Sequence, residues 1–419
     1  MNKYISFLFF IFLSFTILDN LQAQDTVKSD SLRKNALNIF LDCYDCSMEY
    51  IKKEITFVNY VRDQKDAQLY IMVTSQSTGS GGIEYTMKFM GRKENIGTDN
   101  TLKYRTTPNE TEDEIRKKGL QFLKMGLMPY VANTPLANEI KIDFISEAEP
   151  DKLIDPWKSW IFDINGSSYI NGEESIKSSY FSSYVNASKV TEKYKINFYA
   201  DYSSNQNEYK LDDTTTFKSH SDSKNFKTIY VKSIGEHWSV GATVSASTST
   251  FNNLKHSYRV FPAIEYDFYK YSESTRRQLC FLYEIGGNNK KYIDTTIYNK
   301  IDENLFMHAL SLSYKVKETW GSIDAKLYGS QYFHDLSKNN LNLYTNLEIR
   351  IYKGLSFNFY AYVALIHDQL SLRKGGASVE EILTYQKQLA SQYSYYTSVG
   401  LTYTFGSIYN NVVNPRFGF

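Results

Sequence analysis

The chain has 419 residues, enough for about two domains. Its 47 basic residues balance 46 acidic ones, so the charge gives no reason to expect nucleic acid or a polybasic lipid site. Downstream of Leu18 no apolar run approaches the roughly 20 residues of a spanning helix, which excludes a bundle of membrane helices. The 36 tyrosines and 26 phenylalanines are nevertheless many for a chain of mean hydropathy −0.43.

Residues 1–23 predict a secretory signal peptide. Lys3 precedes an apolar run from Ile5 to Leu18, and small or polar residues surround Ala23. The run is shorter than the roughly 20 residues that cross a bilayer as a helix. No cysteine stands at the expected cleavage point after Ala23. We therefore expect export and cleavage, without a lipoprotein anchor.

Residues 24–150 predict a small α/β domain. Short apolar segments bounded by polar residues indicate strands, and one short segment between them indicates a helix. The expected strands are 37–41, 57–61, 68–74, 82–89 and 102–106, and the expected helix is 47–54. About 110 residues of this kind are enough for an independent core.

A second helix is expected to begin at Thr111. Thr111 and Glu114 have the spacing of a capping box, in which the hydroxyl and the carboxylate each satisfy one free backbone amide. The helix is expected to end at Gly126 or Pro129. The expected buried stripe consists of Ile115, Phe122 and Met125.

Residues 156–406 alternate between apolar and polar side chains, as in Leu341–Ile351, where every odd position but Thr345 is aliphatic. This period of two indicates strands. We expect twelve: 158–168, 175–188, 193–205, 225–234, 238–250, 257–269, 277–287, 304–316, 320–332, 341–352, 355–368 and 393–406. The predicted fold is an all-β transmembrane barrel of about 12 antiparallel strands preceded by a small α/β periplasmic domain, with 407–419 as a C-terminal tail.

A soluble β-sandwich also has alternating strands. Its strands are about half as long as these, and it does not explain the aromatic content, whereas a membrane barrel uses aromatic girdles at both interfaces. Connection lengths agree with a barrel, because short connections such as 353–354 alternate with longer ones such as 369–392. The short ones would be periplasmic turns, which places residues 24–150 in the periplasm.

Charged residues of both signs recur at positions expected to face the barrel lumen. They have two interpretations: they line a narrow polar passage, or they pair across the lumen and close it. The sequence leaves both open. The lumen-lining candidates are Asp163, Lys195, Asp201, Arg259, Glu265, Glu284, Lys326, Glu348 and Arg350.

Cys43 and Cys46 have the spacing of a redox pair. Asp42 and Asp45 disfavour the thiolate that redox chemistry needs, so a structural disulfide in an oxidising periplasm is the better interpretation. Cys280 is expected to be a small filler of the lumen. The glycine-rich segment 78–82 lacks the helix that a phosphate loop requires and predicts a turn.

We expect no enzymatic activity, no cofactor and no metal. The chain has six histidines. His308 falls on the lipid-facing positions, and the others lie at strand ends or in loops, so no Ser–His–carboxylate set is indicated.

Two segments carry a resemblance to known sequences. The end of the chain, Tyr403–Phe417, resembles a C-terminal signature of uncharacterised outer-membrane barrel proteins from Bacteroidetes-type bacteria, and 50–63 with 78–82 resembles the periplasmic part of the same group. The resemblance implies a Gram-negative outer membrane, contact with its lipid, and no assigned substrate. In barrel proteins generally the barrel assembly machinery reads a terminal aromatic residue. Phe405, at the end of the last expected strand, and Phe419 both fit.

The expected function is that of a porin-like narrow channel, or a transport or assembly accessory, whose periplasmic domain docks a protein partner. The alternative is a closed structural or adhesive barrel that acts through its extracellular loops, above all residues 375–393.

Overall fold

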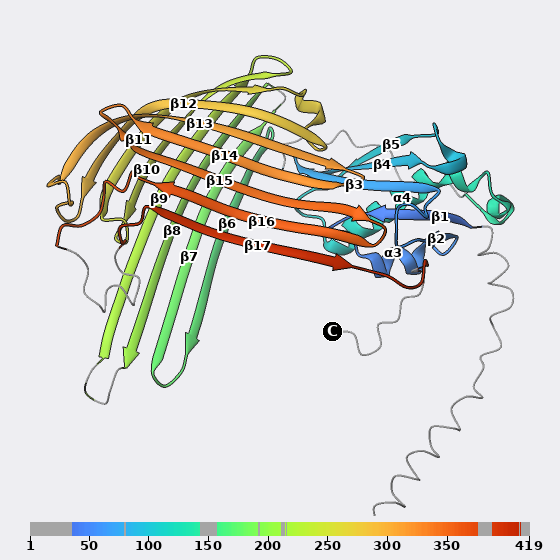
Figure 1. Ribbon diagram of the computed structural model, residues 1–419, viewed down its shortest axis with the longest axis horizontal. Helices are drawn as coiled ribbons and strands as arrows, with labels where there is room; N and C mark the ends of the chain where they lie inside the picture. Colours follow the sequence, from blue (N-terminus) through green and yellow to red (C-terminus); the bar gives the residue numbers. More distant parts are fainter. Residues whose placement is uncertain are drawn as a thin grey trace, which may run out of the picture.

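The computed structural model describes residues 36–78, 81–142, 157–191, 193–210, 214, 216–375, 388–409 and 411. The predicted signal peptide, 1–23, and Phe419 lie outside these residues. The described chain forms two β-sheets (Figure 1), one of five strands in the N-terminal domain and one of twelve strands. None of its helices is long and apolar enough to cross a membrane.

The N-terminal domain is a mixed sheet with helices on one side. Its elements are β1 (Leu37–Asp42), α3 (Met48–Glu54), β2 (Val58–Tyr60), β3 (Leu69–Ser77), β4 (Ile83–Gly91), β5 (Asn100–Arg105) and α4 (Glu112–Val131). The strand order is β2-β1-β3-β4-β5. Strand β1 runs parallel to β2 and β3, whereas β3, β4 and β5 are antiparallel. The predicted strands and the short helix are therefore all present.

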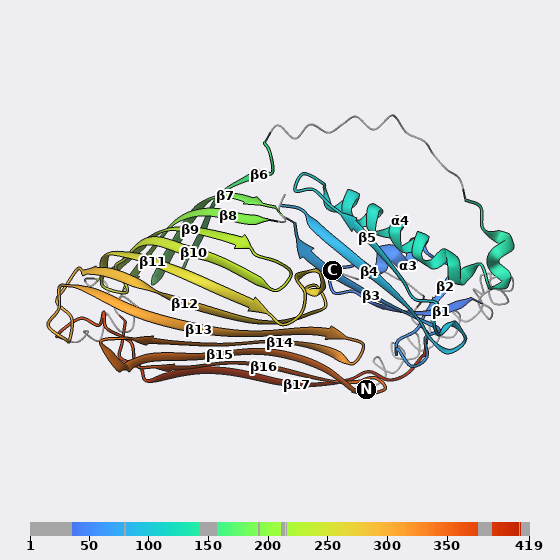
Figure 2. The ribbon, with the colours of Figure 1, turned by 90° about the horizontal axis from the view of Figure 1, so that it is seen from above.

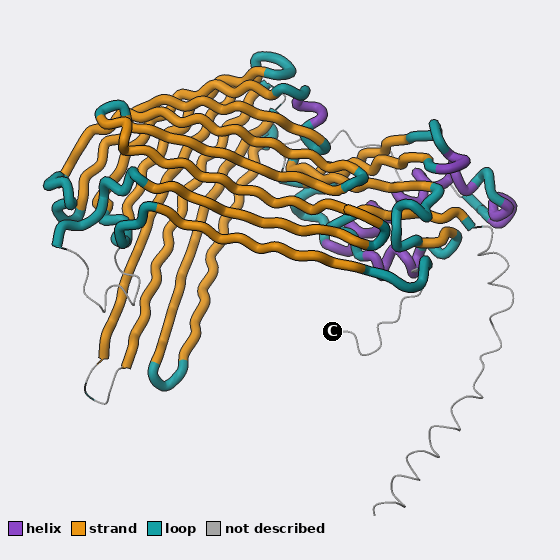
Figure 3. Tube along the Cα trace, viewed as in Figure 1, coloured by secondary structure: helices purple, strands orange, loops and turns teal. Residues whose placement is uncertain are grey.

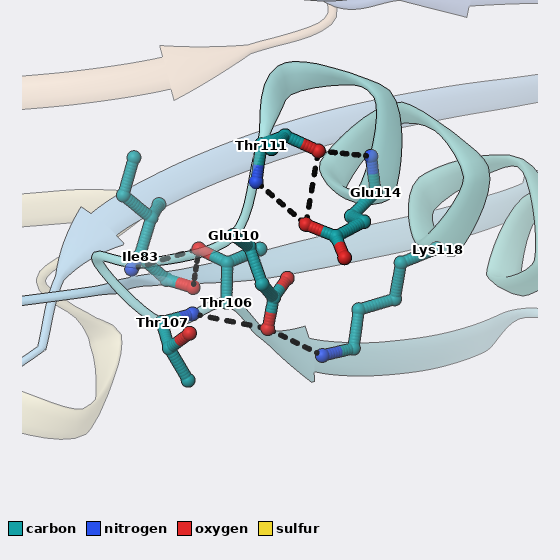
Figure 4. A network of polar contacts seen from close by, with 7 residues as sticks. All are labelled: Ile83, Thr106, Thr107, Glu110, Thr111, Glu114 and Lys118. Carbon is teal, nitrogen blue, oxygen red and sulfur yellow. Dashed lines mark hydrogen bonds and ion pairs between the residues drawn. The ribbon is translucent and has the colours of Figure 1, made fainter.

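Helix α4 begins where the capping box predicts (Figure 4). The Glu114 amide donates to Thr111 Oγ1 at 3.3 Å, and the Thr111 amide donates to a Glu114 carboxylate oxygen at 2.7 Å. Just before the cap, Glu110 accepts a hydrogen bond from the Thr107 amide and pairs with Lys118 at 3.2 Å. These contacts fix the turn between β5 and the helix.

The predicted end and buried stripe of this helix are wrong in part. The helix continues through Pro129 to Val131, and Met125 is 45% exposed. Gly126 is buried instead, because a glycine lets the helix lie against the ring of Phe89, where a Cβ atom would be 1.9 Å from Cζ. The residues of α4 that enter the core are Leu120, Leu123, Leu127, Tyr130 and Val131.

This close approach makes Gly126 sensitive to substitution. We expect Gly126→Ala to destabilise the N-terminal domain by about 1–3 kcal/mol through overpacking against the fully buried Phe89, although alanine favours helix. Pulse proteolysis of the full chain in urea measures this. Met125→Ala, one residue away, is the control and should change stability by less than about 0.5 kcal/mol. Equal effects of the two variants would contradict the packing described.

The large sheet is an antiparallel meander of twelve strands, which confirms the predicted fold class. Its strands are β6 (Trp160–Gly172), β7 (Ile176–Val190), β8 (Tyr194–Lys210), β9 (Thr216–Ser233), β10 (Trp238–Ser249), β11 (Leu254–Asp267), β12 (Arg277–Tyr292), β13 (Asp302–Glu318), β14 (Gly321–Tyr332), β15 (Asp335–Tyr352), β16 (Leu355–Ile366) and β17 (Tyr393–Tyr403). Each pairs with the next in the chain.

Several strands extend further than predicted into segments that the sequence assigns to loops. Strand β9 begins at Thr216 and β15 at Asp335, and β12 runs on to Tyr292. These extensions are rich in serine, lysine and asparagine. When both faces of a hairpin are exposed to water, its strands can carry polar side chains at every position and still form backbone hydrogen bonds. The alternation of apolar and polar residues that identifies the other strands is therefore missing there.

The sheet is strongly curled, and the N-terminal domain lies against one of its ends (Figure 2). Strands β6 and β17 are the two edges of the described sheet, and no hydrogen bond in the described residues pairs them. The short turns between β13 and β14 and between β15 and β16 lie at the end nearest the N-terminal domain (Figure 3).

Candidate functional site

The two faces of the large sheet differ in chemistry. One face presents large apolar side chains, such as Ile164 at 82% and Leu401 at 69% exposed. Alternate positions on the same strands, such as Asp163 on β6 and Ser398 on β17, carry polar groups to the other face. The polar face, which contacts the N-terminal domain at one end and segment 367–374 at the other, is the candidate site.

Amide and carboxylate groups connect the first four strands across the polar face. Asn186 donates to Asp163 at 3.0 Å and accepts from Asn197 at 2.6 Å. Asn225 donates to Asp201 at 3.1 Å. Asp163 and Asp201, two of the predicted lumen-lining residues, are thus hydrogen-bonded to a neighbouring strand. Lys195 on β8, a third, is exposed.

Further along the sheet the predicted residues occupy the same face with different partners. Glu265 accepts a hydrogen bond from the Tyr271 hydroxyl at 2.9 Å. The Arg259 guanidinium lies over the Phe261 ring at 4.7 Å. Glu284 is half-buried, and Lys326 and Glu348 are exposed. The structure therefore does not gather these charges into one pair or cluster.

Arg350 lies near the end of β15 that is closest to the N-terminal domain, and it contacts that domain. Its guanidinium is 3.2 Å from the Asp42 carboxylate and 3.1 Å from the Tyr70 hydroxyl, and it lies over the Phe40 ring. Tyr70 also donates to Asp42, and burial, followed by the Asp42 charge, raises the pKa of Tyr70. The sequence predicts Arg350 as a lumen-lining residue, but the structure places it in a polar contact between the domains.

Further contacts between the two domains lie at the nearby turns. We define the inner latch as these contacts together with those of Arg350. The Gly354 amide donates to Asp63 at 2.8 Å, and Lys353 pairs with Asp66 at 2.6 Å. Lys317 donates to the Val73 carbonyl at 3.1 Å. No pattern in the sequence predicts these contacts, because loop residues such as those at 62–66 follow no period.

The N-terminal domain also reaches both edges of the large sheet. Gly81 in the β3–β4 hairpin lies against Ile161 of β6, where a Cβ atom would be 3.2 Å from Cδ1. Beyond β17, the tail runs beside β2: the Arg62 amide donates to the Ile408 carbonyl at 3.0 Å, and Val61 and Tyr409 form an antiparallel bridge. The domain therefore spans the gap between the two edge strands at this end.

The tail contact corrects the expected end of the last strand. Strand β17 ends at Tyr403, and Phe405 lies beyond it with its carbonyl accepting from the Arg62 guanidinium at 2.8 Å. The chain leaves the large sheet here because it turns toward β2. Phe405 is exposed and stacks on Tyr403.

At the end of the large sheet farthest from the N-terminal domain, which we call the outer end, hydrogen bonds connect three loops around Asn253. Its side-chain amide donates to the Asp294 and Ser371 carbonyls at 2.8 and 3.0 Å. Arg373 donates to the Thr250 carbonyl at 2.7 Å. Leu370 is buried in an apolar cluster with Phe261, Leu305, Met307 and Tyr332. The segment 367–374 thus packs over the outer end of the sheet.

The three cysteines and His308 are bonded to or packed against other residues of the fold. Cys43 and Cys46 are joined in a disulfide with a Cα separation of 5.5 Å, and Cys280 is a buried free thiol. His308 stacks on Phe333 with ring centroids 4.9 Å apart. Within the described residues, no group of three or more histidine, cysteine, aspartate or glutamate side chains is placed to hold a metal ion.

Comparisons with known proteins give distant structural similarities. No protein-family model and no curated protein matches the chain. The translocator domain of autotransporter NalP from Neisseria meningitidis aligns at 10% identity and TM-score 0.17, over 58% of this chain and 81% of that one. CdiB from Acinetobacter baumannii aligns at 7% identity and TM-score 0.27, over 80% and 70%. Scores this low carry no argument about arrangement or activity.

Proposed function

We propose that the chain is an outer-membrane β-barrel that closes by pairing β6 with β17. In this proposal it is a non-enzymatic narrow channel, or a transport or assembly accessory, of a Gram-negative bacterium. Its polar face lines the lumen, and its N-terminal domain lies in the periplasm, where it docks a partner protein.

The observation that carries the proposal is the exposed apolar face on alternate positions of twelve successive strands. Apolar surface costs roughly 25 cal/mol per Å² in water, and soluble monomers rarely expose large contiguous apolar patches. A lipid environment removes this cost, and closure of the sheet satisfies the backbone groups of both edge strands.

The orientation rests on the connections. The N-terminal domain contacts Lys317 at the end of β13, Thr319 in the β13–β14 turn and Gly354 in the β15–β16 turn, and both turns are among the short connections. Barrels of this class have short periplasmic turns and longer outer loops. The inner latch then covers the periplasmic mouth, and the loops around Asn253 cover the extracellular one.

Single-channel recording in planar bilayers tests the channel. We expect Glu348→Lys to shift ion selectivity toward anions and Lys326→Glu to shift it toward cations, because both side chains are exposed on the proposed lumen face. The reversal potential in a salt gradient measures this shift. Glu54→Lys, at the end of α3 in the N-terminal domain, is the matched control and should leave the reversal potential unchanged.

A second candidate function is a closed barrel that acts through its outer loops. The contacts of Asn253 and Arg373 favour it, because they hold segment 367–374 over the outer end of the sheet. A folded, heat-modifiable protein that stays electrically silent, both as the native chain and with the inner latch broken by Arg350→Met, would reject the channel and leave this alternative.

A further inference from the structure

The N-terminal domain contains a cavity of about 450 Å³ between α3, α4 and the sheet. The volume lies in the range of pockets that take small ligands or anchoring side chains. Most of its lining is apolar or aromatic. The lining residues on the sheet are Leu41, Val73, Tyr85, Met87 and Tyr104, and those on the helices include Tyr50, Ile51, Ile115, Leu120 and Leu123.

This cavity opens on the side of the sheet opposite the inner latch. Successive residues of a strand point to opposite faces. On β1, Phe40 and Asp42 contact Arg350, whereas Leu41 between them lines the cavity. On β3, the Tyr70 side chain belongs to the latch, whereas Val73 lines the cavity and only its backbone carbonyl contacts Lys317. The cavity is therefore free for a ligand while the domain is docked on the large sheet.

The cavity floor presents a tyrosine hydroxyl. Tyr85 and Tyr104 stack with ring centroids 4.8 Å apart. Tyr104 is 8% exposed, and its hydroxyl lies beside Gly119 of the cavity lining, where a Cβ atom would be 2.8 Å away. Burial raises the pKa of Tyr104, which keeps the hydroxyl protonated as a donor. A protonated hydroxyl beside the cavity can donate a hydrogen bond to an acceptor on a ligand.

The mouth of the cavity is acidic. Asp45 and Glu112 line it and form no ion pair with any described residue. The one cation of the lining, Arg116, is held by Asp113 at 2.6 Å and lies over the Tyr50 ring. The unpaired charges at the mouth are therefore negative and complement a basic group.

We propose that this cavity is the docking point for the periplasmic partner. The partner is a polypeptide that inserts an aromatic or aliphatic side chain between α3 and α4, places a backbone carbonyl on the Tyr104 hydroxyl, and sets a flanking lysine or arginine beside Asp45 and Glu112. The inference rests on the proposed partner-docking role and names the chemistry of the partner.

Fluorescence anisotropy with the full chain in nanodiscs tests the proposal. The probe is a labelled peptide of sequence Gly-Lys-Phe-Lys-Gly, compared with Gly-Glu-Phe-Glu-Gly and Gly-Lys-Ala-Lys-Gly. We expect saturable binding of the first peptide alone, weakened roughly tenfold by the double variant Asp45→Asn with Glu112→Gln and weakened by salt. Tyr104→Phe, which keeps the ring, should weaken binding about two- to tenfold.

Glu49→Gln is the matched control, because Glu49 is an exposed carboxylate on α3 outside the cavity lining. It should leave the affinity unchanged. Absence of saturable binding, equal binding of the acidic peptide, or equal effects of the control and the double variant would overturn the proposal. The assay does not depend on conductance, so an electrically silent protein that binds the peptide would reject the channel and keep the docking site.

Discussion

Replacing Arg350 with methionine is expected to loosen the N-terminal domain from the large sheet by about 2–3 kcal/mol. The side chains of Arg350 and Asp42 are 23% and 14% exposed. Methionine keeps much of the apolar stem but leaves Asp42 without its cation in a partly buried place. Lys353→Met is the control, because its pair with Asp66 is more exposed and should contribute at most about 1 kcal/mol.

Cysteine trapping measures this docking. Gln64 donates to the Thr319 carbonyl at 2.9 Å across the interface, so a short bifunctional thiol reagent should join cysteines at these two positions in the docked state. In that background, Arg350→Met should slow cross-linking far more than Lys353→Met. Equal rates in the two variants would show that Arg350 does not hold the domain in place.

A disulfide across the proposed seam between β6 and β17 is expected to lock the barrel. If the apolar faces of both strands point to lipid, odd positions on β6 must oppose even positions on β17. Asn165→Cys should therefore cross-link with a cysteine at one of Ser394, Ser398 or Thr402 in membranes. The locked form should stay compact on heating in detergent, which electrophoresis detects.

The matched controls move the second cysteine to the other face of β17. A cysteine at Thr397 or Val399 lies one residue from Ser398 and faces the other side of the sheet. We expect no cross-link from Asn165→Cys to either of them. Cross-linking to both faces alike, or to neither, would refute closure between these strands.

Alternation predicted the large sheet well, because a period of two is a direct consequence of one apolar and one polar face. The segment 341–351 is an example, and it lies wholly within β15. The same rule could not find the outer extension of β15 from Asp335, where both faces are polar. Helical spacing likewise predicted the wrong burial for Met125 on α4, because the approach of Gly126 to Phe89 depends on tertiary packing.

The candidate site was harder to predict for the same reason. The polar positions on the strands follow from parity, and Asp163 and Asp201 each accept a hydrogen bond from an asparagine on the neighbouring strand. Arg350 has the parity of a lumen residue, but its partner Asp42 is 308 residues away in the sequence. No local pattern connects two such positions, and only the fold shows that they meet.

The pairing of the tail with β2 has a consequence for the order in which the chain can fold. Asn411 accepts from the Tyr60 amide at 2.6 Å, a contact between residues 351 positions apart. Strand β2 is an edge strand, and an uncovered edge invites pairing with other chains. During synthesis the N-terminal domain is thus incomplete until the segment around Asn411 follows it. A chain truncated before this segment leaves the edge of β2 open to pairing with other chains.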